Sequence, residues 1–148
     1  LIARQPGVVP AGDASDTVIA FCDMLPTFAE LAGAAPPSDL DGLSLAGVLQ
    51  GQPLKRQRDY LYWDYGHCRP RYDQAVRLGD WKGVRRGADS PIELYDLSED
   101  PGEQHNVAET HPEIVARIAS IMHQAVVPSQ RYPIGKLYTG KPIWQRAD

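Results

Sequence analysis

The sequence predicts an α+β fold: a four-stranded antiparallel sheet with a C-terminal helix packed on one face. Strand-forming runs bounded by turn residues follow one another across residues 59–97. Two of these runs flank the dipeptide Gly79-Asp80, a typical hairpin connection, and a later stretch across 114–125 has apolar residues at helical spacing. With 148 residues, 43% of them hydrophobic, the chain is long enough to bury a core.

Residues 1–58 read as loops around one short helix. Arg4–Asp16 is rich in Pro, Gly and small residues and is expected to be irregular, whereas Val18–Cys22 suits either a buried strand or a helical turn. A helix is predicted over Met24–Ala32, capped by Asp23 and ended by Gly33. The paired prolines of 34–40 predict a loop. One or two helical turns are expected over 43–49, and a linker over 51–58.

Four strands are expected in the second half. The first follows Asp59 and contains Tyr60–Tyr65, the hairpin pairs Asp73–Leu78 with Trp81–Arg86, and Ile92–Leu97 supplies the fourth strand. Trp81 is expected to be packed and Lys82 to be exposed.

The last helix is expected to cover the sheet. Thr110 with Glu113 resembles a capping box, and the stripe that follows consists of Ile114, Ile118, Ile121, Met122 and Ala125. Prolines at 128, 133 and 142 then predict an irregular tail over 128–148.

Composition excludes several classes of function. A net charge of −4 offers no basic face for nucleic acid, and no apolar run approaches the roughly 20 residues that cross a bilayer. Cys22 and Cys68 have no CxxC spacing, so they signal neither a zinc site nor a disulfide framework, and both are expected to be structural. Because no initiating Met or signal sequence is present, the chain is expected to be the interior of a longer protein.

Seven ordered motifs resemble the C-terminal part of the sulfatase family. The resemblance covers roughly residues 1–130. Within the family, the sequence is similar in character to bacterial arylsulfatases. The motifs are residues 1–12, DMLPTFAELAG from Asp23, DGLSL from Asp41, LYWDY from Leu61, QAVRLGDWKGV from Gln74, ELYDLSEDPGEQHNVA from Glu93 and HPEIVARI from His111.

This resemblance implies three segments. Residues 1–52 would be the trailing segment of an alkaline-phosphatase-like α/β catalytic domain, 53–127 the C-terminal subdomain, and 128–148 the irregular tail. The chain would complete the fold of an arylsulfatase-like sulfuric ester hydrolase and one wall of its substrate cleft. The first third is then expected to pack less regularly, or to pack against another chain, because its usual partner is absent and its apolar surface needs a contact.

The resemblance also implies cofactors that this chain does not supply. Sulfatases use a formylglycine made from a CxPxR or SxPxR motif, together with calcium. The stretch from Cys68 to Tyr72 has Tyr in place of the Arg, and the stretch after Cys22 lacks the Pro. No catalytic residue and no metal ligand is therefore predicted here, calcium and formylglycine are expected in the parent enzyme, and the chain alone is expected to be inactive.

Three cationic side chains are the candidate substrate contacts. His67, Arg69 and Arg71 follow the first strand within five residues, and a sulfate ester favours such donors. Two readings stay open for these residues: they contact the leaving-group portion of the substrate, or they belong to an ordinary solvated loop. The acidic residues Asp96, Glu99, Asp100 and Glu103 do not follow the EF-hand spacing, and turn or cap roles are expected for them.

The sequence leaves alternative functions open and implies partners. The chain could belong to a phosphodiesterase or phosphonate hydrolase of the same superfamily, or be a non-enzymatic α+β interaction module with an aromatic face at Tyr60, Tyr62, Trp63 and Tyr65. As a sulfatase part, its partners would be the upstream catalytic domain and a sulfated small molecule or carbohydrate. Exposed apolar surface could also join copies of the chain into a homo-oligomer. The resemblance favours a periplasmic or extracellular location in a bacterium for the parent enzyme.

Overall fold

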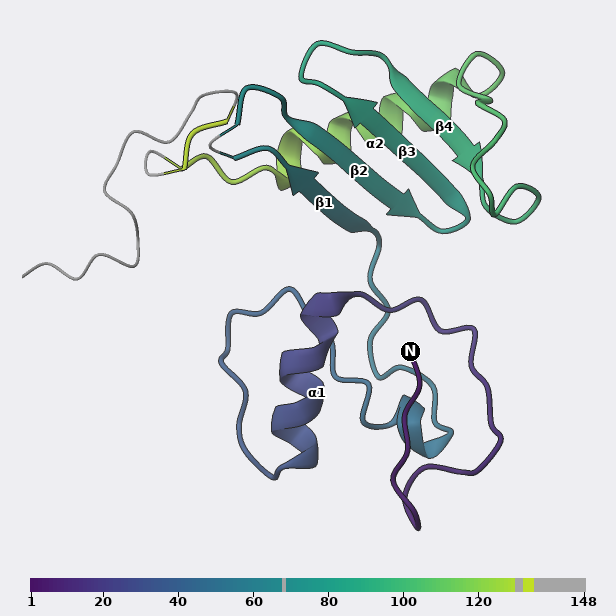
Figure 1. Cartoon of the computed structure of the whole chain (residues 1–148), viewed down its shortest axis with the longest axis vertical. Coiled ribbons are helices and arrows are strands. Elements are labelled where there is room, and N and C mark those ends of the chain that lie inside the picture. Colours follow the sequence, from purple (N-terminus) through teal and green to yellow (C-terminus); the bar gives the residue numbers. More distant parts are fainter. Residues whose placement is uncertain (68, 130–131, 135–148) are drawn as a thin grey trace, which may run out of the picture. The chain divides into compact units, whose positions relative to one another are not determined.

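The chain forms two compact units, Leu1–Arg58 and Asp59–Asp148, which we call unit 1 and unit 2 (Figure 1). The computed structural model describes residues 1–67, 69–129 and 132–134. No helix among these residues has the length and hydrophobicity needed to cross a membrane.

Unit 1 contains little regular structure. Its elements are the 3-10 turn η1 (Phe21–Asp23), the helix α1 (Met24–Leu31) and the 3-10 turn η2 (Val48–Gln50). Val18–Cys22, which suited either a buried strand or a helical turn, forms no strand: Ala20 is extended, and the chain then enters η1. The one or two turns expected over 43–49 reduce to η2, which begins at Val48 and ends at Gln50, one residue beyond that stretch.

Helix α1 ends at the predicted glycine. Gly33 has φ +70°, its N–H donates to the carbonyl of Glu30 at 3.1 Å, and the N–H of Ala34 donates to the carbonyl of Ala29 at 2.9 Å. This pair of bonds is a Schellman motif, which satisfies carbonyls that a helix end otherwise leaves free.

The predicted cap at the start of α1 is wrong. Asp23 makes no side-chain cap bond, because it has helical angles of φ −72° and ψ −17° as the last residue of η1. A capping side chain usually stands on extended backbone, from which it reaches the first free N–H groups of the helix. The Asp23 carboxylate instead accepts bonds from outside α1.

Unit 2 is a four-stranded antiparallel meander, as predicted. Its strands are β1 (Leu61–Tyr65), β2 (Asp73–Leu78), β3 (Trp81–Arg86) and β4 (Ile92–Asp96), in the order β1-β2-β3-β4. Gly79 has φ +61° in the β2–β3 connection, a backbone conformation that costs glycine little. The two predicted hairpin strands have the predicted bounds.

Helix α2 (Pro112–Ala125) packs across one face of the sheet (Figure 1). The core between them is formed by Val76, Leu78, Leu94, Ile118 and Met122. The helix crosses the sheet above Gly83, where an added Cβ would lie 2.6 Å from Cγ2 of Ile118. A glycine at this strand position therefore permits the close approach of α2.

The start of α2 differs from the predicted capping box. The Thr110 hydroxyl donates to the carbonyl of Val107 at 2.9 Å, and His111 stands at the N-cap without a side-chain bond to the free N–H groups of the helix. Pro112 occupies the first helical position, where its fixed φ suits the helix and its missing N–H costs nothing. In the predicted tail, the described residues contain only an isolated bridge between His67 and Ile134, and 130–131 and 135–148 lie outside the description.

Candidate functional site

The three predicted substrate contacts lie in the β1–β2 connection but differ in their surroundings. Arg69 places its guanidinium 4.7 Å from the ring centroid of Tyr65. Arg71 is exposed, and its Nε donates to Oδ1 of Asp73 at 2.7 Å. His67 is half-buried and turned toward other protein groups.

Both ring nitrogens of His67 contact acceptors. Nδ1 lies 2.9 Å from the carbonyl oxygen of Tyr132, and Nε2 lies 3.3 Å from Oδ2 of Asp64. The bond with the Tyr132 carbonyl raises the pKa of His67; partial burial opposes this rise, and the Asp64 carboxylate adds to it. The imidazolium form, in which both nitrogens donate, therefore fits this site best.

Asp64 is the centre of a hydrogen-bond network that sequence reasoning missed. Its Oδ2 accepts from the hydroxyls of Tyr62 at 3.0 Å and Tyr72 at 2.7 Å. Burial, together with bonds to Tyr62 and Asp64, raises the pKa of Tyr72 strongly. Burial also raises the pKa of Tyr62, so both phenols remain protonated donors.

The network continues toward α2 through Gln74. The side-chain amide of this buried residue donates to the Tyr62 hydroxyl at 2.9 Å and to the carbonyl of Met122 at 3.1 Å, and Arg85 donates to its oxygen. These polar side chains share the α2 face with the core residue Val76. The sequence signal for this network was the presence of polar residues at strand positions on the same face as core residues.

In unit 1, buried polar groups hold two of the family-like motifs together. The Asp23 carboxylate, which is fully buried, accepts from the N–H groups of Ala20 at 2.7 Å and Leu43 at 2.8 Å and from the Arg58 guanidinium. Burial alone would raise the pKa of Asp23, but these donors outweigh it and hold the pKa below its usual value.

Thr27 makes a second link between the same motifs. Its hydroxyl donates to the Asp23 carbonyl at 2.6 Å and accepts from the N–H of Leu45 at 2.8 Å. Gly42 lies so close to the carbonyl of Cys22 that a Cβ would be 2.0 Å from that oxygen. The DGLSL stretch is therefore fixed against α1 by specific backbone contacts.

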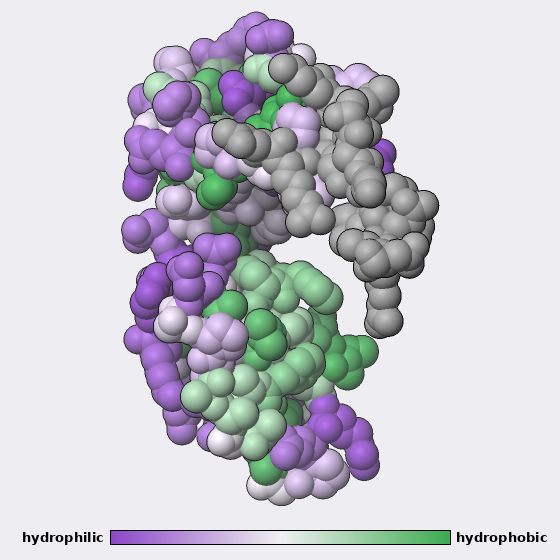
Figure 2. All heavy atoms as spheres, turned by 90° about the vertical axis from the view of Figure 1, so that its left-hand side faces the viewer, coloured by the Kyte–Doolittle hydropathy of each residue, from purple (hydrophilic) through white to green (hydrophobic). Residues whose placement is uncertain are grey.

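Helix α1 keeps an apolar face uncovered within unit 1. The face consists of Leu25, Phe28 and Leu31 of α1 and Phe21 of the preceding η1, which are 53%, 63%, 39% and 91% exposed. A groove runs beside it, lined also by Met24 and Leu40. Hydrophobic atoms gather over this unit on the side seen in Figure 2. Large exposed apolar surfaces of this kind mark interaction sites.

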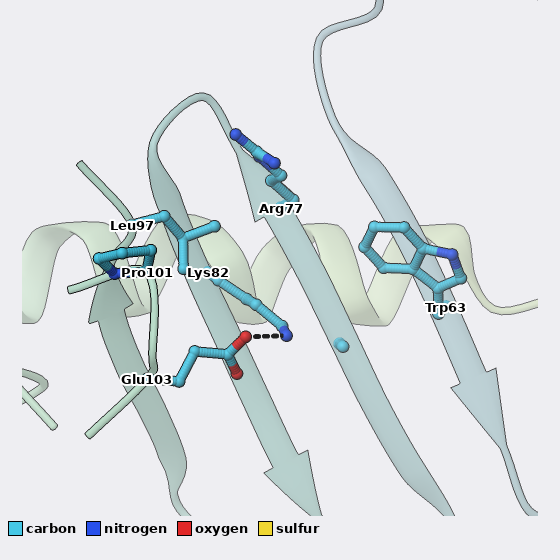
Figure 3. A pocket seen from close by; sticks show the side chains of 7 residues that line it. Trp63, Arg77, Lys82, Leu97, Pro101 and Glu103 are labelled. Atoms are coloured by element: carbon cyan, nitrogen blue, oxygen red, sulfur yellow. Dashed lines mark hydrogen bonds and ion pairs between the residues drawn. The ribbon is translucent and has the colours of Figure 1, made fainter. Parts of the chain in front are cut away.

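The sheet of unit 2 carries a hollow, lined by both apolar and charged side chains, on the face opposite α2, which we call the outer face. The hollow measures about 660 Å³ and is lined by Trp63, Ala75, Arg77, Lys82, Leu97, Pro101 and Glu103 (Figure 3). Glu103 has φ +55° and pairs with Lys82. Lys82 is thus half-buried and paired, not simply exposed as predicted.

The acidic turn after β4 has the structural roles expected for it. Asp96 accepts from the N–H and hydroxyl of Ser98, and Asp100 accepts from the N–H groups of Gln104 and His105. These bonds lower the pKa of both carboxylates. The turn is closed by its own side chains.

Calcium and formylglycine are the cofactors that the resemblance implies for the parent enzyme. The described residues contain no group of three or more His, Cys, Asp or Glu side chains that could share a metal ion. Cys22, expected to be structural, is exposed, with its Sγ 3.9 Å from Oδ1 of Asp23. Cys68 lies outside the described residues. No reaction step is assigned to any of these groups.

Comparison with known proteins identifies the chain. The family model described as N-sulphoglucosamine sulphohydrolase, C-terminal, matches residues 1–131. The chain is similar to the ulvan-active sulfatase of Formosa agariphila, with 32% identity over 72% of the chain and 28% of the relative. It is also similar to the N-acetylglucosamine-6-O-sulfatase of Bacteroides thetaiotaomicron, with 32% identity over 72% of the chain and 20% of the relative.

Solved structures agree with this result. A structure described as a 2-O GAG sulfatase matches with a TM-score of 0.62 and 30% identity, covering 70% of this chain and 23% of that one. The crystal structure of Ps i-CgsB matches with a TM-score of 0.70, and the match covers 92% of this chain and 30% of that one. Because the identity is 22%, this match supports the fold alone. The chain thus spans less than a third of the length of each of these relatives, and it belongs to the sulfatase family as a C-terminal portion.

Proposed function

We propose that this chain completes the fold of an arylsulfatase-like sulfuric ester hydrolase. The observation that carries the proposal is the match to a sulfatase C-terminal family over residues 1–131, in a chain whose α1 leaves an apolar face uncovered. Residues 1–52 would be the trailing segment of the catalytic domain, and the rest of that domain would cover α1.

The interior of unit 1 supports this assignment. Its buried residues are two polar ones, Asp23 and Thr27, and three apolar ones, Pro26, Leu45 and Ala46, in that half of the described chain. The Nε of Arg58 is buried without a hydrogen-bond partner among the described residues. A buried donor of this kind is costly unless a further acceptor completes it.

We further propose that the β1–β2 loop forms part of the cleft wall, where it contacts the leaving-group portion of the substrate. Arg69 and Arg71 are exposed and carry guanidinium groups suited to a sulfate or to polar leaving groups. His67 would act by positioning this loop, since both of its nitrogens are engaged by Asp64 and Tyr132.

Replacing the loop cations in the full-length enzyme tests this role. The triple change His67→Gln, Arg69→Gln and Arg71→Gln is expected to raise KM about tenfold with a smaller effect on kcat, because contacts made equally in ground and transition states act on KM. The matched control is Arg117→Gln on α2. Unchanged substrate affinity in the triple variant would remove the cleft-wall role.

The substrate class and cofactors follow from the same proposal. The named relatives act on sulfated carbohydrates, so a sulfated carbohydrate or small molecule is the proposed substrate of the whole enzyme. Calcium and formylglycine would be supplied by polypeptide other than the described residues. The phosphonate hydrolase alternative is not favoured, because the matching family model and the named relatives are sulfatases.

A direct activity measurement tests whether catalysis needs the parts of the enzyme outside this chain. This chain, incubated with an aryl sulfate and calcium, is expected to release no phenol above the buffer blank, while the full-length enzyme turns over under the same conditions. Calcium-dependent turnover by this chain alone would contradict the proposal.

A further inference from the structure

The hollow on the outer face differs in chemistry from the groove of unit 1. The hollow is lined by one indole, two cations and a carboxylate beside apolar side chains, whereas the groove is lined mainly by Phe, Leu and Met side chains and has two carboxylates, of Asp39 and Asp41, but no cation. Buried centres of protein–protein interfaces are depleted in charged residues and enriched in aromatic ones. The groove therefore suits a protein surface, and the hollow suits a polar ligand.

The register of the sheet creates the hollow. Trp63 on β1 pairs with Ala75 on β2, and Arg77 on β2 pairs with Lys82 on β3, so all four side chains lie on the outer face. The small Ala75 leaves space between the larger side chains of the neighbouring strands (Figure 3). Trp63 is 42% exposed, which leaves part of its indole free for contact.

Arg77 gives the hollow an unneutralised positive charge. Other cations near this face are paired with carboxylates, in the pairs Arg71–Asp73, Lys82–Glu103 and Arg86–Glu93. Arg77 donates its Nε to the carbonyl of Gly79 at 3.1 Å and has no carboxylate partner among the described residues. Its terminal nitrogens are thus available to an anion in the hollow.

We propose that this hollow binds an anionic sugar unit, with its sulfate or carboxylate on Arg77 and its ring against Trp63. A guanidinium presents a fork of donors that matches such anions, and an indole offers an apolar surface to the C–H face of a sugar ring. Lys82 and Glu103 supply a further donor and acceptor for hydroxyl groups. The site would hold a carbohydrate chain away from the reacting ester, an inference that rests on the proposed function.

An NMR titration of this chain tests the site. The probe is a chondroitin 6-sulfate disaccharide, which is expected to shift the Trp63 indole N–H and amides of β2 and β3 in a saturable way. Arg77→Gln should weaken binding about tenfold or more, as expected for one charge-assisted hydrogen bond. The matched control Arg86→Gln removes a cation on the same face outside the hollow and should leave affinity within about twofold.

Three results would overturn the site. The first is the absence of a saturable shift at about 10 mM disaccharide, a concentration that would populate even a weak site. The second is equal weakening of binding by Arg86→Gln and Arg77→Gln. The third is equal binding of a neutral disaccharide or an acidic peptide. Retained dispersion of the amide spectrum shows that each variant is folded. The aryl sulfate assay is independent of Arg77, so the failure of one proposal is distinguishable from failure of the other.

Discussion

The two units of this chain are stabilised in different ways. Unit 2 buries a continuous apolar core between its sheet and α2, formed by residues far apart in sequence. Unit 1 has a small interior organised by the Asp23 carboxylate and the Thr27 hydroxyl, while Phe21 and Phe28 remain exposed. Burying a large apolar side chain contributes about 1.5–3 kcal/mol, so unit 1 lacks a stabilisation that unit 2 already has.

This difference teaches which part of the chain is complete by itself. A sheet of four strands with one face covered by a helix pairs its inner strands on both sides and buries its apolar stripe. A short helix with one face uncovered depends on tertiary packing that unit 1 does not provide. We therefore expect the units to respond differently to changes in polar and apolar contacts.

The largest expected effect comes from Asp23→Ala. It removes the acceptor shared by Ala20, Leu43 and Arg58 and leaves the partly buried guanidinium uncompensated, a loss of about 3–5 kcal/mol. Hydrogen exchange should then lose protection across unit 1 and keep it in unit 2. The control is Asp16→Ala, an exposed carboxylate. Unchanged exchange in unit 1 would mean that the polar network does not stabilise it.

A slightly smaller effect is expected in unit 2 for Ile118→Ala. The side chain is fully buried above Gly83, so its truncation should cost about 2–5 kcal/mol. Urea unfolding followed by tryptophan fluorescence measures the change, and Arg117→Ala on the exposed side of α2 is the control. Loss of protection in unit 1 at the same urea concentration would contradict independent units.

The smallest effect is a pH dependence carried by His67. Its native pKa is raised, so its contribution to stability is fully present below its ordinary pKa of 6.5 and is lost as pH rises through the native pKa. For a partly exposed pair we expect about 0.2–1 kcal/mol. His67→Gln should remove this dependence from the unfolding free energy of unit 2, whereas His123→Gln should not. An unaltered profile in His67→Gln would assign the dependence elsewhere.

Local sequence signals predicted the fold of unit 2 but not its polar network. Alternation of strand residues and Gly79 determine the hairpin within a few residues, so its bounds were predictable. The contacts of Asp64 with Tyr72 and of Gln74 with Met122 depend on how strand ends and α2 meet. The caps at Asp23 and Thr110 failed because the Asp23 carboxylate accepts from the distant N–H of Leu43, and the Thr110 hydroxyl donates back to the carbonyl of Val107.

The candidate sites were predictable to different degrees. The β1–β2 loop was recognised because its cations are adjacent in sequence. The hollow was not, because Trp63, Arg77 and Glu103 come from separate segments that only the register and the loop after β4 bring together.

The most direct test of the central claim compares Phe28→Ser in two contexts. In this chain the side chain is 63% exposed, so the unfolding free energy should change by less than about 0.5 kcal/mol. In the full-length sulfatase, where the catalytic domain would cover α1, the same change should cost about 1.5–3 kcal/mol. Equal small effects in both contexts would contradict the claim that the rest of the enzyme packs on this face.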